Sequence, residues 1–174
     1  MNTIHPKQHK GFTLVELLIV IVIIGILTAI SIVAYNGVMG RANDATVQQD
    51  LKQLATKLEM YRAENSGYPG ASGGINNNLS SLGFKASKSS YYIISSNSNL
   101  GYCFQSDDNS IYKVIAKSKS GKNFYISSSS NSPQILSSFS CTVVPSMPST
   151  DTNYMGYNST DTTTGPWRAW AGGN

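Results

Sequence analysis

The one carboxylate at the border of a long apolar run carries the most specific chemistry in this sequence. Glu16 follows a polar, basic leader, and no charged side chain occurs between residues 17 and 40. A helix over that run would reach roughly 36 Å at about 1.5 Å per residue, enough to cross the hydrocarbon core of a bilayer. A carboxylate deep in lipid costs about 3 kcal/mol or more. The position of Glu16 therefore predicts a compensating partner.

The groups that catalysis or metal binding would need are scarce. Both histidines, His5 and His9, lie in the leader, so a processed chain would lack the usual base for a serine or cysteine nucleophile. Asp107, Asp108 and Asn109 adjoin one another without the EF-hand spacing of calcium ligands. No glycine-rich phosphate-binding motif is present. We therefore expect no enzyme activity, no metal and no cofactor.

The leader predicts the orientation of the apolar run. Lys7 and Lys10 place positive charge on its N-terminal side, which favours a cytoplasmic leader and an exported remainder after Gly40. Three interpretations stay open: a secretory signal peptide, an uncleaved membrane anchor, and a specially processed segment. Glu16 and the length of the run disfavour the signal peptide, although Ala29-Ile30-Ser31 resembles a small-residue cleavage site.

Cys103 and Cys141 are the only cysteines. In an exported chain such a pair favours one disulfide. The bond would close a loop of roughly 39 residues and stabilise the fold by about 4 kcal/mol on the chain-entropy model. A metal site is the alternative, but two thiols alone supply too few ligands.

The residues around the junction resemble a known motif. Gly11-Phe12-Thr13-Leu14-Val15-Glu16 before an apolar helix is similar to the processing site of type IV prepilins and of their relatives, the type II secretion pseudopilins and competence pilins. The resemblance covers residues 7–40. It implies that a prepilin peptidase cuts after Gly11 and that Phe12 becomes the N-methylated first residue. Glu16 then matches the family's glutamate, whose carboxylate meets the Phe12 amine of a neighbouring subunit in the filament.

The resemblance implies a structural role. The expected protein is a subunit of a type IV pilus, a helical homopolymer that serves adhesion, motility or DNA uptake. It would cross the cytoplasmic (inner) membrane once before assembly and lie on the cell surface afterwards. Its partners would be itself, the peptidase, the assembly machinery, membrane lipid, and DNA or host ligands. The alternatives are a pseudopilin or minor pilin of a secretion or competence system, and a membrane-anchored adhesin.

Five segments are expected to position these residues in an α+β fold. They are a leader at 1–11, a transmembrane and assembly helix at 12–40, an amphipathic helix at 41–66, a loop and antiparallel sheet at 67–141, and an irregular Ser/Thr/Pro-rich tail at 142–174. Two tryptophans, Trp167 and Trp170, stand near the end of the tail. They are expected to pin the tail to the domain, to contact the next subunit, or to engage an outside ligand.

The amphipathic helix is predicted from an apolar stripe with helical spacing. The stripe consists of Val47, Leu51, Leu54, Leu58 and Tyr61. Its short length favours packing against a sheet over a coiled coil. The charged residues of the segment, Asp44 and Asp50 among them, are expected on the remaining faces.

The sheet is predicted from four short β-like runs separated by turn residues, at 91–95, 101–105, 111–117 and 123–127. The third run alternates, with one face toward the helix and the other toward water. Residues 70–90 are expected to form a loop with little regular structure.

Lysines gather around one expected hairpin: Lys113, Lys117, Lys119 and Lys122. A solvated strand face is the ordinary interpretation. The alternative is a weak cationic patch that contacts DNA or an anionic surface and gains avidity when repeated along a fibre.

Overall fold

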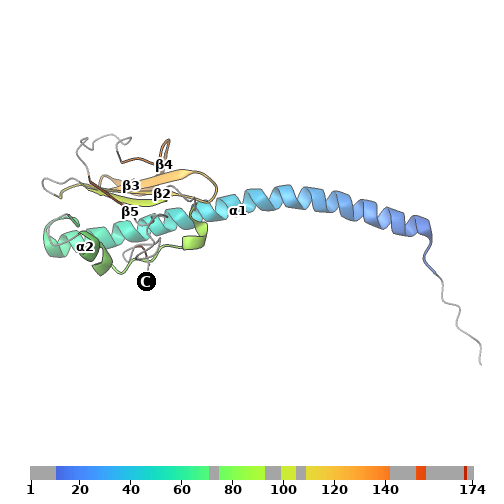
Figure 1. Cartoon of the computed structure of the whole chain (residues 1–174), viewed down its shortest axis with the longest axis horizontal. Helices are drawn as coiled ribbons and strands as arrows, with labels where there is room; N and C mark the ends of the chain where they lie inside the picture. Colours follow the sequence, from blue (N-terminus) through green and yellow to red (C-terminus); the bar gives the residue numbers. More distant parts are fainter. Residues whose placement is uncertain are drawn as a thin grey trace, which may run out of the picture. The chain divides into compact units, whose positions relative to one another are not determined.

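The computed structural model describes residues 11–70, 75–92, 99–104, 109–141, 152–155 and 171. The chain divides into two compact units, Met1–Met39 and Gly40–Asn174. Along the chain follow helix α1 (Leu14–Asn65), helix α2 (Ile75–Ser81), the 3-10 helix η1 (Lys88–Ser90), and strands β1 (Leu100–Phe104), β2 (Tyr112–Lys117), β3 (Asn123–Ser127), β4 (Ser130–Leu136) and β5 (Thr152–Met155). The predicted α+β class is confirmed (Figure 1).

The first unit consists of the N-terminal part of α1 and the residues before it. Every side chain from 11 to 39 is exposed, and this part of the helix is long and apolar enough to cross a membrane. Two of its hydroxyl groups are satisfied within the helix, since Thr28 Oγ1 donates to the Ile24 carbonyl at 2.7 Å and Ser31 Oγ donates to the Leu27 carbonyl at 2.7 Å. The unit therefore presents an apolar surface without unpaired hydroxyl groups at these positions.

The second unit is built on the remainder of α1. The predicted stripe is buried at Val47, Leu51, Leu54 and Leu58, whose side chains are at most 1% exposed. The sheet covers this side of the helix (Figure 1), and Tyr102, Tyr112, Val114 and Phe124 belong to the same core. The prediction that the stripe packs against a sheet is confirmed.

The helix ends where turn residues begin. Asn65 is the last helical residue, and Ser66 takes a left-handed conformation with φ 60. The chain then turns into the core, where the Tyr68 ring meets that of Tyr112 edge-on at 4.6 Å. Tyr102 O–H donates to the Pro69 carbonyl at 3.0 Å, so the end of the helix is tied to β1.

All neighbouring strands are antiparallel, in the order β4-β3-β2-β1-β5. Strands β1, β2 and β3 lie where the second, third and fourth runs predict them, to within one residue. The first run, 91–95, was predicted as a strand, but Tyr91 forms only an isolated bridge with Ser118. Residues 93–95 lie outside the described part of the chain.

Three regular elements occur where irregular chain is predicted. Helices α2 and η1 lie in the expected loop at 70–90, and β5 lies in the expected irregular tail. Strand β4 was not predicted because its serines and Pro133 are typical of turns. The strand forms because β3 supplies pairing partners, and it occupies a sheet edge, where proline is tolerated. Trp167 and Trp170 lie outside the described residues.

The second face of β2 is not exposed to water as predicted. Ile115 is fully buried and joins Cys103, Leu136 and Cys141 in a second apolar cluster. Cys103 and Cys141 form a disulfide with a Cα–Cα distance of 6.0 Å. The segment that ends at Cys141 therefore covers the sheet face opposite α1.

The packing of the stripe can be tested by truncation. We expect Leu54→Ala to lower the free energy of unfolding by about 2–5 kcal/mol, because it leaves a cavity under the sheet. Met60→Ala is the control, since Met60 lies on the same helix and is 60% exposed; its cost should stay within about 0.5 kcal/mol. Urea unfolding of the full chain in detergent micelles measures the free energy of unfolding of both variants. Equal costs in the two variants would contradict the observed packing.

Candidate functional site

The first turn of α1 contains a reciprocal hydrogen-bonded cap. Glu16 Oε2 accepts hydrogen bonds from Thr13 N–H at 2.8 Å and from Thr13 Oγ1 at 2.9 Å. Glu16 N–H donates back to Thr13 Oγ1 at 3.3 Å. Thr13 directly precedes the first helical residue, so the pair is a capping box. The carboxylate thus has hydrogen-bond donors within its own chain.

The predicted processing residues lie just outside this cap. Gly11 and Phe12 precede the helix, and both are exposed, with Phe12 at 86%. An exposed peptide bond outside regular secondary structure is accessible to a protease. The predicted pairing of Glu16 with a Phe12 amine involves a second copy of the chain and stays a prediction.

The predicted lysine patch is only partly at the surface. Lys113 is 1% exposed, and its Nζ donates to the Cys141 carbonyl at 3.2 Å. The prediction of a surface contact was therefore wrong for Lys113, because the disulfide segment covers this face of β2. Lys117 is half-buried with its Nζ 4.5 Å from the centre of the Tyr92 ring.

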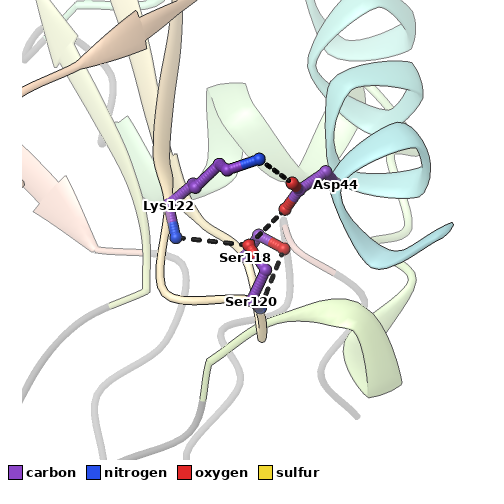
Figure 2. A network of polar contacts seen from close by, with 4 residues as sticks. All are labelled: Asp44, Ser118, Ser120 and Lys122. Atoms are coloured by element: carbon purple, nitrogen blue, oxygen red, sulfur yellow. Dashed lines mark hydrogen bonds and ion pairs between the residues drawn. The ribbon is translucent and has the colours of Figure 1, made fainter. Parts of the chain in front are cut away.

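Lys119 and Lys122 are exposed, and Lys122 takes part in a polar network that sequence reasoning missed (Figure 2). Lys122 Nζ lies 2.9 Å from Asp44 Oδ2 on α1, and Ser120 Oγ donates to Asp44 Oδ1. Ser118 Oγ accepts from Ser120 N–H at 3.2 Å, within the turn between β2 and β3. Asp44 is only 6% exposed, so the network fastens this turn to the helix.

The network changes the acidity of Asp44. Burial raises the pKa of the carboxyl group, but hydrogen bonds from Ser120, Ser118 and Lys122, together with the Lys122 charge, lower it by more. The net result is a pKa below the ordinary value for aspartate. Asp44 therefore stays ionised inside the fold at neutral pH.

Asp50 forms a second buried anchor. Its carboxylate accepts from Ser87 N–H at 2.7 Å, Ser87 Oγ at 3.0 Å and Tyr91 O–H at 3.1 Å. Burial and the adjacent carboxylate raise the pKa of Tyr91 well above its ordinary value. Both aspartates were expected on solvent-facing positions, yet each stands three residues from Val47 and so is in phase with the apolar stripe. This spacing from Val47 is the feature of the sequence that indicates the burial of both aspartates.

The described residues contain no group of three or more His, Cys, Asp or Glu side chains that could hold a metal ion. Asp107 and Asp108 lie outside them. What the arrangement offers chemically is an exposed peptide bond, a capped carboxylate and an apolar helix surface.

Comparison with known proteins agrees with this arrangement. Residues 6–32 match the family described as the prokaryotic N-terminal methylation motif. The chain is 40% identical over 99 residues to the type IV wide pilus major component PilA4 of Thermus thermophilus, covering 56% of this chain and 72% of that protein. It is 39% identical over 72 residues to type II secretion system core protein G of Pseudomonas aeruginosa, covering 40% of this chain and 49% of that protein.

The match to the Escherichia coli K12 core protein G is similar, at 34% identity over 68 residues, 39% of this chain and 47% of that protein. The chain thus spans about half the length of the secretion proteins that it matches.

The N-terminal helix with its methylation motif, followed by an α+β unit, defines the class of pilin-like structural proteins. Within this class, the chain belongs to the type IV pilin family, which includes the type II secretion pseudopilins. The resemblance inferred from residues 7–40 is confirmed.

The Asp44 network predicts a pH dependence. We expect Asp44→Asn to lower the free energy of unfolding at neutral pH by about 1–3 kcal/mol, the cost of weakening charged hydrogen bonds in a buried site. Folding lowers the pKa, so this stabilisation is complete above the unfolded pKa of about 3.9 and is lost as the pH falls through the folded value. The difference between the two proteins, measured by urea unfolding, should shrink below about pH 4.

Lys122→Met is the matched control. The Lys122 side chain is 57% exposed, so its loss should cost less than about 1 kcal/mol. If Asp44→Asn had no larger effect than Lys122→Met, the carboxylate would not be the anchor of the turn.

Proposed function

We propose that this protein is the polymerising subunit of a type IV pilus. The observation that carries the proposal is the exposed apolar surface of residues 14–39, which are followed in the chain by a globular unit with its own core. Such a surface must be covered, first by lipid and then by the same helix of other copies. The similarity to a major pilus component over 72% of its length supports this role. The role is structural, without catalysis.

In this proposal the chain matures in two steps. An inner-membrane prepilin peptidase removes residues 1–11 after Gly11, and the new N-terminal Phe12 is methylated. The subunit then leaves the cytoplasmic membrane through the assembly machinery and joins a cell-surface filament. The exposed stretch before the Thr13 cap is well suited to cleavage at this bond.

Glu16 has two roles in this scheme. In the membrane, the Thr13 donors satisfy its carboxylate. In the filament, the carboxylate meets the Phe12 amine of a neighbouring subunit, since a buried charge is tolerated only when it is paired. The pairing fixes the register between copies, and an unclosed rotation produces an open helical fibre.

A second candidate function is a pseudopilus of a type II secretion system. It is favoured by the similarity to core protein G, which extends over 72 residues of this chain. Long surface filaments composed of this chain favour the pilus, whereas a short fibre that appears only together with protein secretion favours the pseudopilus.

Substitution of Glu16 tests the assembly role. We expect Glu16→Ala to be cleaved normally but to be absent from filaments, because it loses both the cap and the charge. Glu16→Gln keeps an acceptor for the Thr13 donors and loses only the charge. If charge pairing between copies drives docking, both variants fail to assemble, as counted by electron microscopy of sheared filaments. Normal filaments from Glu16→Ala would refute the proposed role.

Intact mass measurement tests the processing step. Material from surface filaments should begin at Phe12 and carry one added methyl group at its amine. The membrane fraction of cells that lack peptidase activity provides the control, in which the chain should retain residues 1–11. A filament subunit that begins at Met1 would contradict the proposal and favour an uncleaved anchor.

A further inference from the structure

The last turns of α1 form one wall of a groove, and α2 with the residue after it forms the other wall (Figure 1). The groove has a volume of about 470 Å³. Its apolar lining comes from Met60, Tyr61 and Leu82, of which Met60 is 60% exposed and the other two are half-buried. Leu82 also packs against the main core. The groove therefore presents apolar surface to the outside on a firmly packed base.

One charged group at this groove is left without a partner. Lys57 is engaged, because its Nζ donates to a backbone carbonyl of the opposite wall at 2.7 Å. Arg62 and Glu59 share the hydroxyl of Tyr68, which accepts from Arg62 Nη1 at 3.1 Å and donates to Glu59 Oε1 at 2.8 Å. Glu64 lines the groove and is exposed, and no described residue forms a hydrogen bond or ion pair with its carboxylate. The groove therefore combines an apolar lining with one free negative charge.

A second apolar side chain projects from the edge of the sheet. Ile135 lies on β4, the outermost strand in the order β4-β3-β2-β1-β5, and it is 72% exposed. Among the described residues after Gly40, Ile135 and Met60 are the large hydrophobic residues that are exposed. Leu136, the next residue of the strand, is buried on the other face of the sheet. Ile135 is thus an apolar projection without a cover in its own chain.

The groove and Ile135 lie toward opposite ends of the globular unit. Ile135 stands opposite Phe124 on β3, two residues from Lys122, whose Nζ contacts Asp44 on α1. Met60 lies about 24 Å farther along α1 than Asp44, at about 1.5 Å per residue. The projection and the groove therefore do not meet within one copy of the chain. A contact between them joins one end of a globular unit to the other end of the next.

The charge near Ile135 is opposite to that at the groove. The turn before β3 carries Lys119 and Lys122, and both are exposed. Asp44 pairs with Lys122 (Figure 2), whereas Lys119 has no carboxylate partner in the part of the chain that the structure describes. The projection therefore comes with a free positive charge and the groove with a free negative charge. Such complementarity steers association and fixes the register of a contact.

We propose that Ile135 of one copy inserts into the groove beside Met60 of the next copy, with Lys119 facing Glu64. The inference rests on the proposed filament and names a contact between its globular units. An apolar projection that fits a groove elsewhere on the same molecule produces a head-to-tail contact, which repeats from copy to copy without closing. This contact adds to the one that the apolar helices make and determines which surface of one globular unit meets the next.

Oxidation of Met60 tests the contact in the unmodified chain. Hydrogen peroxide converts an accessible methionine to its sulfoxide, and mass spectrometry of the peptide that contains Met60 gives the rate. We expect severalfold slower oxidation in filaments than in detergent-dispersed subunits, because Ile135 of the next copy covers the groove. Ile135→Ser filaments should lose this protection. Ser132→Ala is the matched control, since Ser132 is exposed on the same strand, and its filaments should keep the protection.

Cross-linking tests the head-to-tail geometry. Filaments of Met60→Cys/Ile135→Cys are treated with a short bismaleimide, to which Cys103 and Cys141 are inert because they are bonded to each other. We expect a ladder of covalent multimers, because every copy supplies one site of each kind. Lys52→Cys/Ile135→Cys is the matched control and should stay monomeric, since Lys52 is exposed on α1 but lies outside the groove.

The outcomes separate this contact from the filament itself. Equal oxidation of Met60 in filaments and in dispersed subunits would overturn the inference and leave the filament in place, as would an equal ladder from the Lys52 control. Covalent dimers from Met60→Cys or Ile135→Cys alone would reveal a symmetric contact and overturn it as well. A wild-type chain that forms no filaments would overturn the proposed function and the inference together.

Discussion

The structure depends on one constraint: the apolar surface of α1 before Gly40 cannot remain in water. Its side chains are exposed throughout, and each Å² of apolar surface in water costs about 25 cal/mol. The first turn is adapted to this constraint, since Thr13 supplies donors to the only carboxylate of the segment. The hydroxyls of Thr28 and Ser31 are satisfied by backbone carbonyls in the same way. At Thr13, Glu16, Thr28 and Ser31, this surface therefore meets its hydrogen-bond requirements within the chain itself.

The globular unit meets a different requirement, which is to hold a small sheet firmly on the second part of the same helix. Apolar packing along the stripe provides the bulk of the core. Asp44 and Asp50 make the packing specific, because each joins α1 to a particular segment through several hydrogen bonds. Apolar contacts alone tolerate sliding, whereas these buried carboxylates allow one register of the turn and of the 3-10 helix against α1.

The helix, its stripe and three strands were predictable because their periodicity is local. For Glu16, the sequence predicted only that its carboxylate needs a partner. Thr13 is that partner, because the first turn of the helix brings residues three apart in the sequence into contact. Strands β4 and β5 were missed because their largely polar sequences form strands only beside β3 and β1. The burial of Lys113 was missed for a related reason. Alternation along β2 reveals that the strand has two faces, but not that a distant segment ending at Cys141 covers one of them.

That covering segment is fixed to the sheet by a covalent bond. Lys113 can lie under the Cys141 carbonyl only while the segment is held in place, and the Cys103–Cys141 bond is what holds it. In thiol-reducing surroundings the back of the sheet would be hydrated and the lysine solvated. The covered face of the sheet therefore depends on the oxidised state of this cysteine pair, so a mainly apolar contact is subject to the redox state of the surroundings.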